Sequence, residues 1–367
     1  MSGLAARTSD STAGPLADWA LAERVARMIA LRDQPAVTRA EVAQLRSELR
    51  ATATRADDLA RSVTGLGGDL PPATVRVVSR GAWLRSNLAS IAWLVDPMAE
   101  QLMDRSDVSR ALARKALGAQ LGLVFGYLAT KVLGQYEVLL PEDEEPGRLT
   151  LVGPNLVQLE REFLPSVRVS SNAFRMGVVL HELAHWLQFE GVDWLRPTLR
   201  QIVSTYLAET RLDADRLRAT VDRLGELLRS ARSGLHLQQF LEVVLTPEQR
   251  ALMTRAQAMM SLLEGHGNVV MDWGAQLLEE RGHTEFEAAG VRQALNERRR
   301  RGADRVLFNL LGLSLKAQQY SVGERFIMAV ERDHGRDVFN RVWRSPDNLP
   351  TLDELEHPDR WVRRMSE

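Results

Sequence analysis

The sequence of 367 residues predicts a mainly α-helical protein of the α+β class, in which a small β-sheet precedes one central helix and further helices are added. Apolar residues recur at helical spacing over most of the chain. Three short β-rich pieces, Tyr136 to Leu140, Leu149 to Val152 and Ser166 to Ser170, stand before the central helix. That helix carries a His-Glu-x-x-His motif, and no Pro or Gly falls between Val178 and Glu190.

The chain before the β-rich pieces is predicted to be helical, with one strand. Residues 1–15 are small and polar, which predicts a disordered tail. Thr38 and Glu41 form a capping-box signature at the start of one helix. The predicted helices are Asp18 to Arg32, Thr38 to Leu66, Trp83 to Leu94 and Val108 to Leu133, and the predicted strand is Thr74 to Ser79.

The chain from the central helix onward is helical in pattern almost to the C-terminus. Ser171 or Asn172 can cap the central helix at its N-terminus. The predicted later helices are Pro197 to Leu217, Thr220 to Ser230, Leu235 to Val244, Pro247 to Glu280, Thr284 to Arg299, Ala303 to Leu311 and Tyr320 to Val342.

The composition narrows the class of protein. A hydrophobic content of 45% and a formal net charge of −1 are typical of a soluble globular protein and do not suggest nucleic acid or an anionic membrane as a partner. The longest uncharged run, Ala116 to Thr130, is shorter than the roughly 20 residues of a membrane span. Its Gly118, Gly122 and Gly126 favour close helix packing instead.

The N-terminus shows no signal-peptide pattern, which predicts a cytoplasmic protein. The oligomeric state stays open.

The motif itself indicates zinc chemistry. On a helix, His181 and His185 lie one turn apart on the same face, at a separation that suits one zinc ion. Glu182 is rotated by about 100° from His181, beside the metal, where it can act on a water molecule. The alternative is a helix with two ordinary histidines that bind no metal. The apolar residues that flank the motif and the low number of histidines favour the zinc site.

A catalytic zinc takes three protein ligands and leaves one position for water. The chain has no Cys, so the ligands must be His or carboxylate. An extended motif would place a third His at the position of Gly191, so the third ligand must come from elsewhere. Glu264 is the best choice because metal binding would offset the cost of burying a carboxylate on its apolar helix.

Other residues could be the third zinc ligand in place of Glu264, and two more could orient the ligands. His266 is a rival, as is Glu209 with Asp213 on the helix that follows the motif. Asn268 and Asp272 follow Glu264 at one and two helical turns, and we expect them to orient the histidine ligands.

Three segments resemble a known bacterial family: His181 to Arg196, Met260 to His266 and Lys316 to Phe326. Its members are zincin-like zinc metallopeptidases or hydrolases, and one branch is associated with biosynthesis of a deazaflavin coenzyme. The resemblance extends from about Asp18 to the C-terminus. It implies a zincin-like fold and a zinc site, and it does not imply a substrate.

Residues and resemblance together predict a three-part chain: a disordered tail at 1–15, an N-terminal helical region at 16–107 and a zincin-like metal-binding domain at 108–367. The predicted function is zinc-dependent hydrolysis, with a peptide or other amide as substrate. Glu182 would be the catalytic base. Tyr320 would stabilise the oxyanion, with Lys316 and Arg325 as alternatives. The alternative function is that of a non-catalytic accessory or binding protein on the same scaffold.

Overall fold

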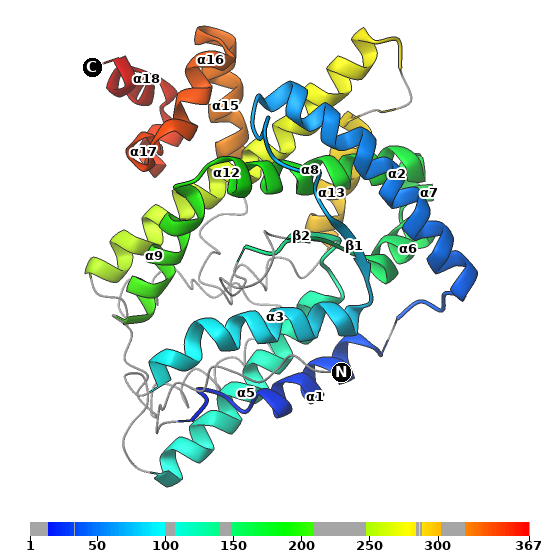
Figure 1. Ribbon diagram of the computed structural model, residues 1–367, viewed down its shortest axis with the longest axis vertical. Coiled ribbons are helices and arrows are strands. Elements are labelled where there is room, and N and C mark those ends of the chain that lie inside the picture. Colours follow the sequence, from blue (N-terminus) through cyan, green and yellow to red (C-terminus); the bar gives the residue numbers. More distant parts are fainter. Residues whose placement is uncertain are drawn as a thin grey trace.

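The computed structural model describes residues 14–32, 34–99, 107–138, 148–208, 247–283, 286, 288–301 and 320–366. Within these residues the protein is mainly helical with one small sheet, as predicted (Figure 1). The predicted helices at 220–230, 235–244 and 303–311, and nearly all of the predicted tail, lie outside the described residues.

The described helices follow the predicted pattern closely in the first half of the chain. Thr38 and Glu41 form the predicted capping box at the start of α2. The α-helices of this half are α1 (Trp19–Ala30), α2 (Arg39–Thr64), α3 (Arg80–Val95), α5 (Asp107–Ala129), α6 (Gly153–Glu162), α7 (Leu164–Val167) and α8 (Ser171–Gly191), with the 3-10 turn η1 (Asp96–Met98).

The second half is also helical, with one predicted helix divided. The helix predicted from Tyr320 to Val342 ends at His334, because Gly335 adopts a positive φ of 88° and starts a new turn. The elements are α9 (Leu195–Ala208), α12 (Pro247–Glu280), α13 (Ala288–Arg301), α15 (Tyr320–His334), α16 (Arg336–Phe339), η2 (Asn340–Arg344), η3 (Pro346–Asn348), α17 (Leu352–Glu356) and α18 (Pro358–Ser366).

The sheet has three short strands in the order β1-β3-β2: β1 (Val75–Val78), β3 (Leu149–Val152) and β2 (Gly134–Tyr136). β1 runs parallel to β3 and β2 antiparallel to it, with Gln135 opposite Thr150. Glu137 donates its backbone N–H to the carbonyl of Arg148. Because strand residues alternate, the backbone groups of Gly134 and Tyr136 face the open edge of the sheet.

The predicted strand from Ser166 to Ser170 is wrong. The chain there forms the short helix α7, which Pro165 helps to start, and then turns through Arg168 with a positive φ of 56°. The hydroxyl of Ser170 accepts from the backbone N–H of Ala173 and caps α8, so the cap lies one residue before the predicted ones. The alternation of Val167 and Val169 was too short to distinguish a strand from a capped turn.

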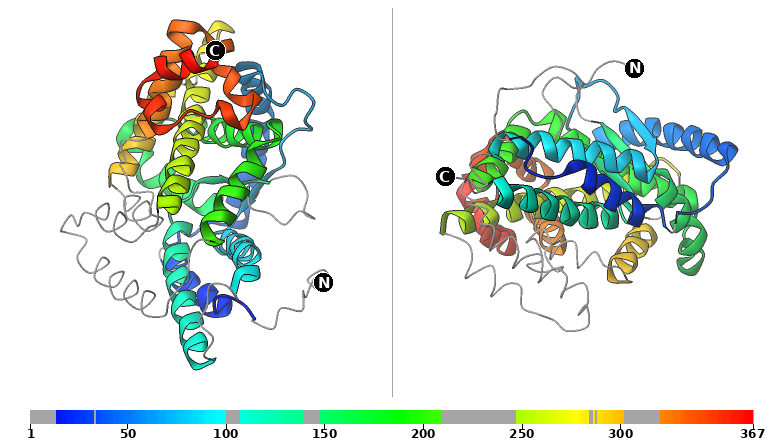
Figure 2. Two further views of the ribbon diagram at one scale, coloured as in Figure 1. Left: turned by 90° about the vertical axis from the view of Figure 1, so that its left-hand side faces the viewer. Right: turned by 90° about the horizontal axis from the view of Figure 1, so that it is seen from below.

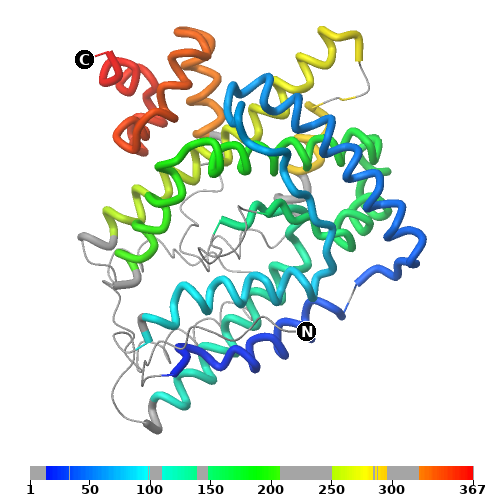
Figure 3. The backbone as a smooth tube through the Cα atoms, viewed as in Figure 1, coloured from blue at the N-terminus to red at the C-terminus, as the bar shows by residue number. Residues whose placement is uncertain are grey.

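Helix α8 lies at the centre of the main core and is covered from both sides. α2 and α12, which are far apart in the sequence, both pack against it (Figure 3). The group α1, α3 and α5 lies at the opposite end of the molecule from α15 to α18 (Figures 1 and 2). In that group the predicted close packing is confirmed. A Cβ atom at Gly118 would lie 2.4 Å from the carbonyl oxygen of Asp18, at the start of α1.

The predicted N-terminal region contacts the predicted metal-binding domain at several places, and α1 and α3 both pack against α5. α2 packs against α8, and β1 pairs with β3. The boundary between residues 107 and 108 stays a prediction.

Helices α12 and α15 touch backbone to backbone at two glycines. A Cβ atom at Gly323 would lie 1.9 Å from the carbonyl oxygen of Ser261, and one at Gly265 would lie 2.4 Å from the backbone nitrogen of Glu324. Gly265 is next to Glu264, so this contact sets the position of that carboxylate. The α12–α15 contact is therefore part of the framework of the site.

We expect Gly323→Ala to lower the free energy of unfolding by about 1–3 kcal/mol or more, because the added methyl group must push two helices apart. The midpoint of thermal unfolding measures this loss. Gly68→Ala is the control, since a Cβ atom there meets nothing within 4 Å. Equal melting temperatures for the two variants would show that the contact can open without cost.

Candidate metal centre

Helix α8 holds the motif rigidly. It is buried on most of its surface, with Val179, Leu180, Leu183 and Leu187 among its buried residues. His181 and His185 keep 13% and 12% of their side-chain surface exposed. Both line a cavity, so the helix presents its two histidines to the same space.

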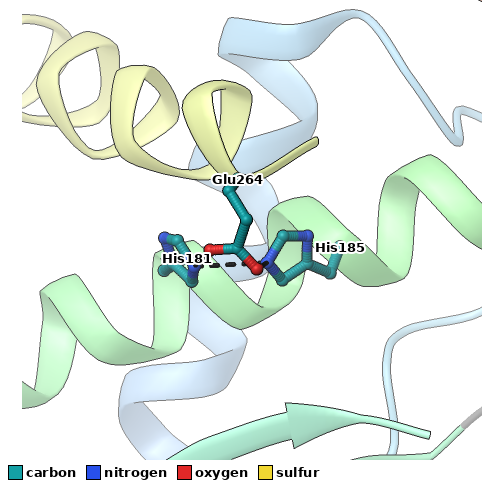
Figure 4. Close-up of side chains that lie close together, drawn as sticks. All are labelled: His181, His185 and Glu264. Atoms are coloured by element: carbon teal, nitrogen blue, oxygen red, sulfur yellow. Dashed lines mark hydrogen bonds and ion pairs between the residues drawn. The ribbon is translucent and has the colours of Figure 1, made fainter. Parts of the chain in front are cut away.

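Three side chains converge at this point (Figure 4). The Nε2 atoms of His181 and His185 are 3.2 Å apart, as their spacing predicts. Glu264 reaches them from α12, with one oxygen 3.5 Å from His181 Nε2 and the other 3.7 Å from His185 Nε2. Glu264 therefore lies close to the histidine pair, and its role as a metal ligand stays a prediction.

The geometry fits a zinc ion. Two ligand atoms at about 2.0–2.1 Å from a tetrahedral zinc are about 3.3 Å apart. The ligand atoms of these three residues all lie within 4.8 Å of one another. Two imidazole nitrogens and one carboxylate are a ligand set of catalytic zinc sites, which keep a fourth position free. The three residues could therefore hold zinc with little movement.

Glu182 lies beside this group and is buried. Burial raises the pKa of its carboxyl group to about 7, and the charge of Glu264 adds to the increase. His185 and a hydrogen bond from the backbone N–H of Tyr136 act in the opposite direction. A carboxylate with a pKa near neutrality suits a general base.

Strand β2 leaves just enough room for Glu182. A Cβ atom at Gly134 would lie 2.6 Å from the Cγ atom of Glu182 and 2.8 Å from its Oε1 atom. The absence of a side chain at Gly134 therefore allows the β2 backbone to lie directly against the carboxylate, where Tyr136 donates to it.

We expect Gly134→Ala to keep bound zinc and to reduce hydrolysis strongly, because the methyl group displaces Glu182 and not the zinc ligands. Zinc content per chain and the rate on a cleaved substrate measure the two effects. Gly68→Ala again serves as the control. A Gly134→Ala protein with the parent's rate would show that Glu182 need not stay where the structure places it.

The cavity beside these residues has a volume of about 380 Å³. Its described lining is largely apolar and includes no Lys or Arg. The apolar lining residues are Leu133, Val138, Val178, Phe189, Leu199, Met260, Leu263 and Leu295, and Tyr136 also contributes. The arrangement suits an uncharged, apolar group next to the zinc ligands.

Of the alternative third ligands, the structure describes only His266. His266 is fully buried and bonded to Gln188, and among the described residues only His181, His185 and Glu264 form a group that could hold a metal. Burial lowers the pKa of His266 to about 3, so it is neutral. Glu209 and Asp213 lie outside the described residues.

The expected role of Asn268 and Asp272 is wrong. Asn268 donates to Glu324 at 3.5 Å, and Asp272 pairs with Arg292. Both face α13 and α15 because those helices pack on that side of α12.

The residue that contacts a histidine of the motif is Gln188, which the sequence did not point to. Gln188 stands between the apolar residues Leu187 and Phe189, and a polar residue buried in such a run must have a hydrogen-bond partner. This pattern could have indicated its role.

The oxyanion-stabilising residue stays a prediction. Tyr320 begins α15, but the structure does not describe its side chain, and Lys316 lies outside the described residues. Arg325 is exposed and does not line the cavity.

Comparisons with known proteins agree with this geometry. A family model described as zincin-like metallopeptidase matches residues 17–362. The crystal structure of a candidate hydrolase with a novel fold from Chloroflexus aurantiacus is similar to this chain, with a TM-score of 0.70 and 29% sequence identity over 96% of this chain and 99% of that chain. No curated protein matches. Among the described helices, none has the length and apolar character needed to cross a membrane.

Proposed function

Because the chain belongs to the zincin-like metallopeptidase family, we propose that it is a zinc-dependent hydrolase that cleaves peptide bonds. The observation that carries this proposal is the convergence of His181, His185 and Glu264 beside the buried Glu182 in one cavity. The association with deazaflavin coenzyme biosynthesis stays an expectation of the resemblance.

In the proposed reaction, three residues bind the metal and one transfers the proton. His181, His185 and Glu264 would hold the metal. When bound, zinc acts as a Lewis acid that lowers the pKa of a water molecule toward about 7. Glu182 accepts the proton of the attacking water at a carboxylate oxygen and later passes it to the leaving amine. The backbone N–H of Tyr136 holds Glu182 in place for both steps.

The open edge of β2 supports a peptide as the substrate. Gly134 and Tyr136 direct their backbone groups away from β3, and both residues line the cavity. The N–H of Tyr136 is used by Glu182, so the N–H of Gly134 and the carbonyl groups of the two residues are the ones that would face a peptide. An extended peptide can add to such an edge through main-chain hydrogen bonds. Its scissile bond would then lie next to Glu182, which the same strand contacts.

The apolar lining supports a preference for an apolar residue next to the cleaved bond. Leu263, Met260 and Phe189 offer contacts to a side chain such as Leu or Phe. The cavity next to His181, His185 and Glu264 also favours an enzyme over an accessory protein, because a motif helix covered by other helices would leave no groove for a substrate.

Incubation of the zinc-loaded protein with a mixture of peptides, followed by mass spectrometry, tests the proposal. We expect cleavage next to large apolar residues by the parent and none by Glu182→Gln. Equal cleavage by both proteins would exclude Glu182 as the base, and cleavage that also persisted in His181→Ala would identify a contaminant. If the zinc-loaded parent and the variant leave every peptide intact, the accessory function gains support and the peptidase proposal fails.

A further inference from the structure

Gln188 is a fully buried amide on α8, one turn after the motif. Its Oε1 atom lies 2.9 Å from Nδ1 of His185. Its Nε2 atom lies 3.2 Å from the carbonyl oxygen of Leu263 and 2.8 Å from Nδ1 of His266. The amide of Gln188 therefore makes three hydrogen bonds, one to a residue of α8 and two to residues of α12.

The carbonyl of Leu263 determines which way the amide points. A backbone carbonyl can only accept a hydrogen bond, so the nitrogen end of Gln188 must face it. The oxygen end must then face His185. Because that oxygen carries no proton, Nδ1 of His185 must donate one. In the neutral ring, Nε2 of His185 then keeps a free lone pair, directed at His181 and Glu264.

His266 fits the same scheme. The second hydrogen of the Gln188 amide points to its Nδ1 atom, which must accept, so the proton of this ring is on Nε2. That Nε2 atom is buried and has no hydrogen-bond partner among the described residues. The rings of Trp273, Phe339 and Trp343 pack around the His266 ring, and the centroids of the His266 and Trp343 rings are 5.0 Å apart. An N–H group is accommodated among aromatic rings better than a lone pair.

We propose that Gln188 is a positioning residue that sets the tautomer of His185, with His266 and the Leu263 carbonyl holding its amide in the required direction. The neutral ring thereby presents an unprotonated Nε2 to the metal before the metal arrives. This inference rests on the proposed zinc site, because only metal binding gives the selected tautomer a function.

His181 provides an internal comparison. Its Nδ1 atom is buried without a hydrogen-bond partner among the described residues. A Cβ atom at Gly267 would lie 2.8 Å from that nitrogen, so packing against α12 and not a hydrogen bond holds this ring. The two ligands are therefore positioned by different means, and loss of Gln188 should affect His185 alone.

Zinc affinity is the first test. We expect Gln188→Leu to weaken zinc binding about 10–100-fold, as loss of a hydrogen bond to a histidine ligand does in other zinc proteins. Gln257→Leu is the matched control, because Gln257 is also a buried glutamine and makes no hydrogen bond to His181 or His185 in the described structure. Competition with a chelator of known affinity measures both.

The role of His266 is tested by a double-mutant cycle. His266→Phe should weaken zinc binding in the parent, because the amide loses one of its two acceptors. In the Gln188→Leu background it should have no further effect, because His266 acts through Gln188 alone. Additive losses would instead show that His266 acts on packing.

Nuclear magnetic resonance of the ¹⁵N-labelled histidines in the zinc-free parent tests the tautomer directly. In the spectrum of the neutral ring, we expect the His185 proton on Nδ1. In Gln188→Leu this preference should be lost, while His181 stays unchanged. A proton on Nε2 of His185 in the parent would overturn the inference even if Gln188→Leu failed to fold.

The outcomes separate this inference from the proposed function. If His181→Ala loses zinc and Gln188→Leu binds it as tightly as the parent, the inference is wrong and the zinc site stands. If the parent itself binds no zinc, the proposed function fails. The inference then fails with it, since the tautomer would serve no ligand.

Discussion

Replacing His181 by alanine is expected to remove zinc from the purified protein. The variant keeps only one imidazole and Glu264 as ligands, and two ligands do not hold zinc against the competing water of the solvent. We expect about one zinc per chain in the parent and close to none in the variant. Metal analysis after dialysis against a weak chelator makes the measurement.

His283→Ala is the matched control, because His283 is exposed in the turn after α12 and is not part of the group that could hold a metal. It should keep the parent's zinc content. Glu264→Gln should bind zinc more weakly than the parent, since the amide removes the charged ligand. A Glu264→Gln protein with unchanged affinity would reassign the third ligand and leave the histidine pair in place.

Glu182→Gln is expected to keep zinc and fold while the rate of hydrolysis falls at least about 10²-fold, the usual contribution of a general base. The amide occupies nearly the same volume but cannot accept the proton of the water. The change also removes a buried carboxyl group whose pKa is raised to about 7 by burial. The folded protein should therefore lose no stability.

Glu279→Gln makes the same chemical change at an exposed position of α12 and should leave both zinc content and rate unchanged. The contrast between the two variants separates catalysis from structure. Full activity in Glu182→Gln would exclude Glu182 as the base, whereas a loss of zinc in that variant would make it a ligand.

The sequence by itself determined what depends on local geometry. The spacing of His181 and His185 brings their rings together on any helix, and the capping box of Thr38 and Glu41 starts α2 where it was predicted. These features are encoded within a few residues, so helical periodicity reveals them. The strand expected at Ser166 to Ser170 failed because four or five residues carry too little periodicity to distinguish a strand from a capped turn.

Only the tertiary structure decided how distant segments complete the site. Glu264 faces the histidines because α12 packs against α8, and Gln188 reaches Leu263 and His266 across the same contact. Gly134 matters because β2 lies against Glu182. Each of these relations joins residues far apart in the chain. Their side chains meet through the packing of whole elements, which the spacing along a single sequence does not encode.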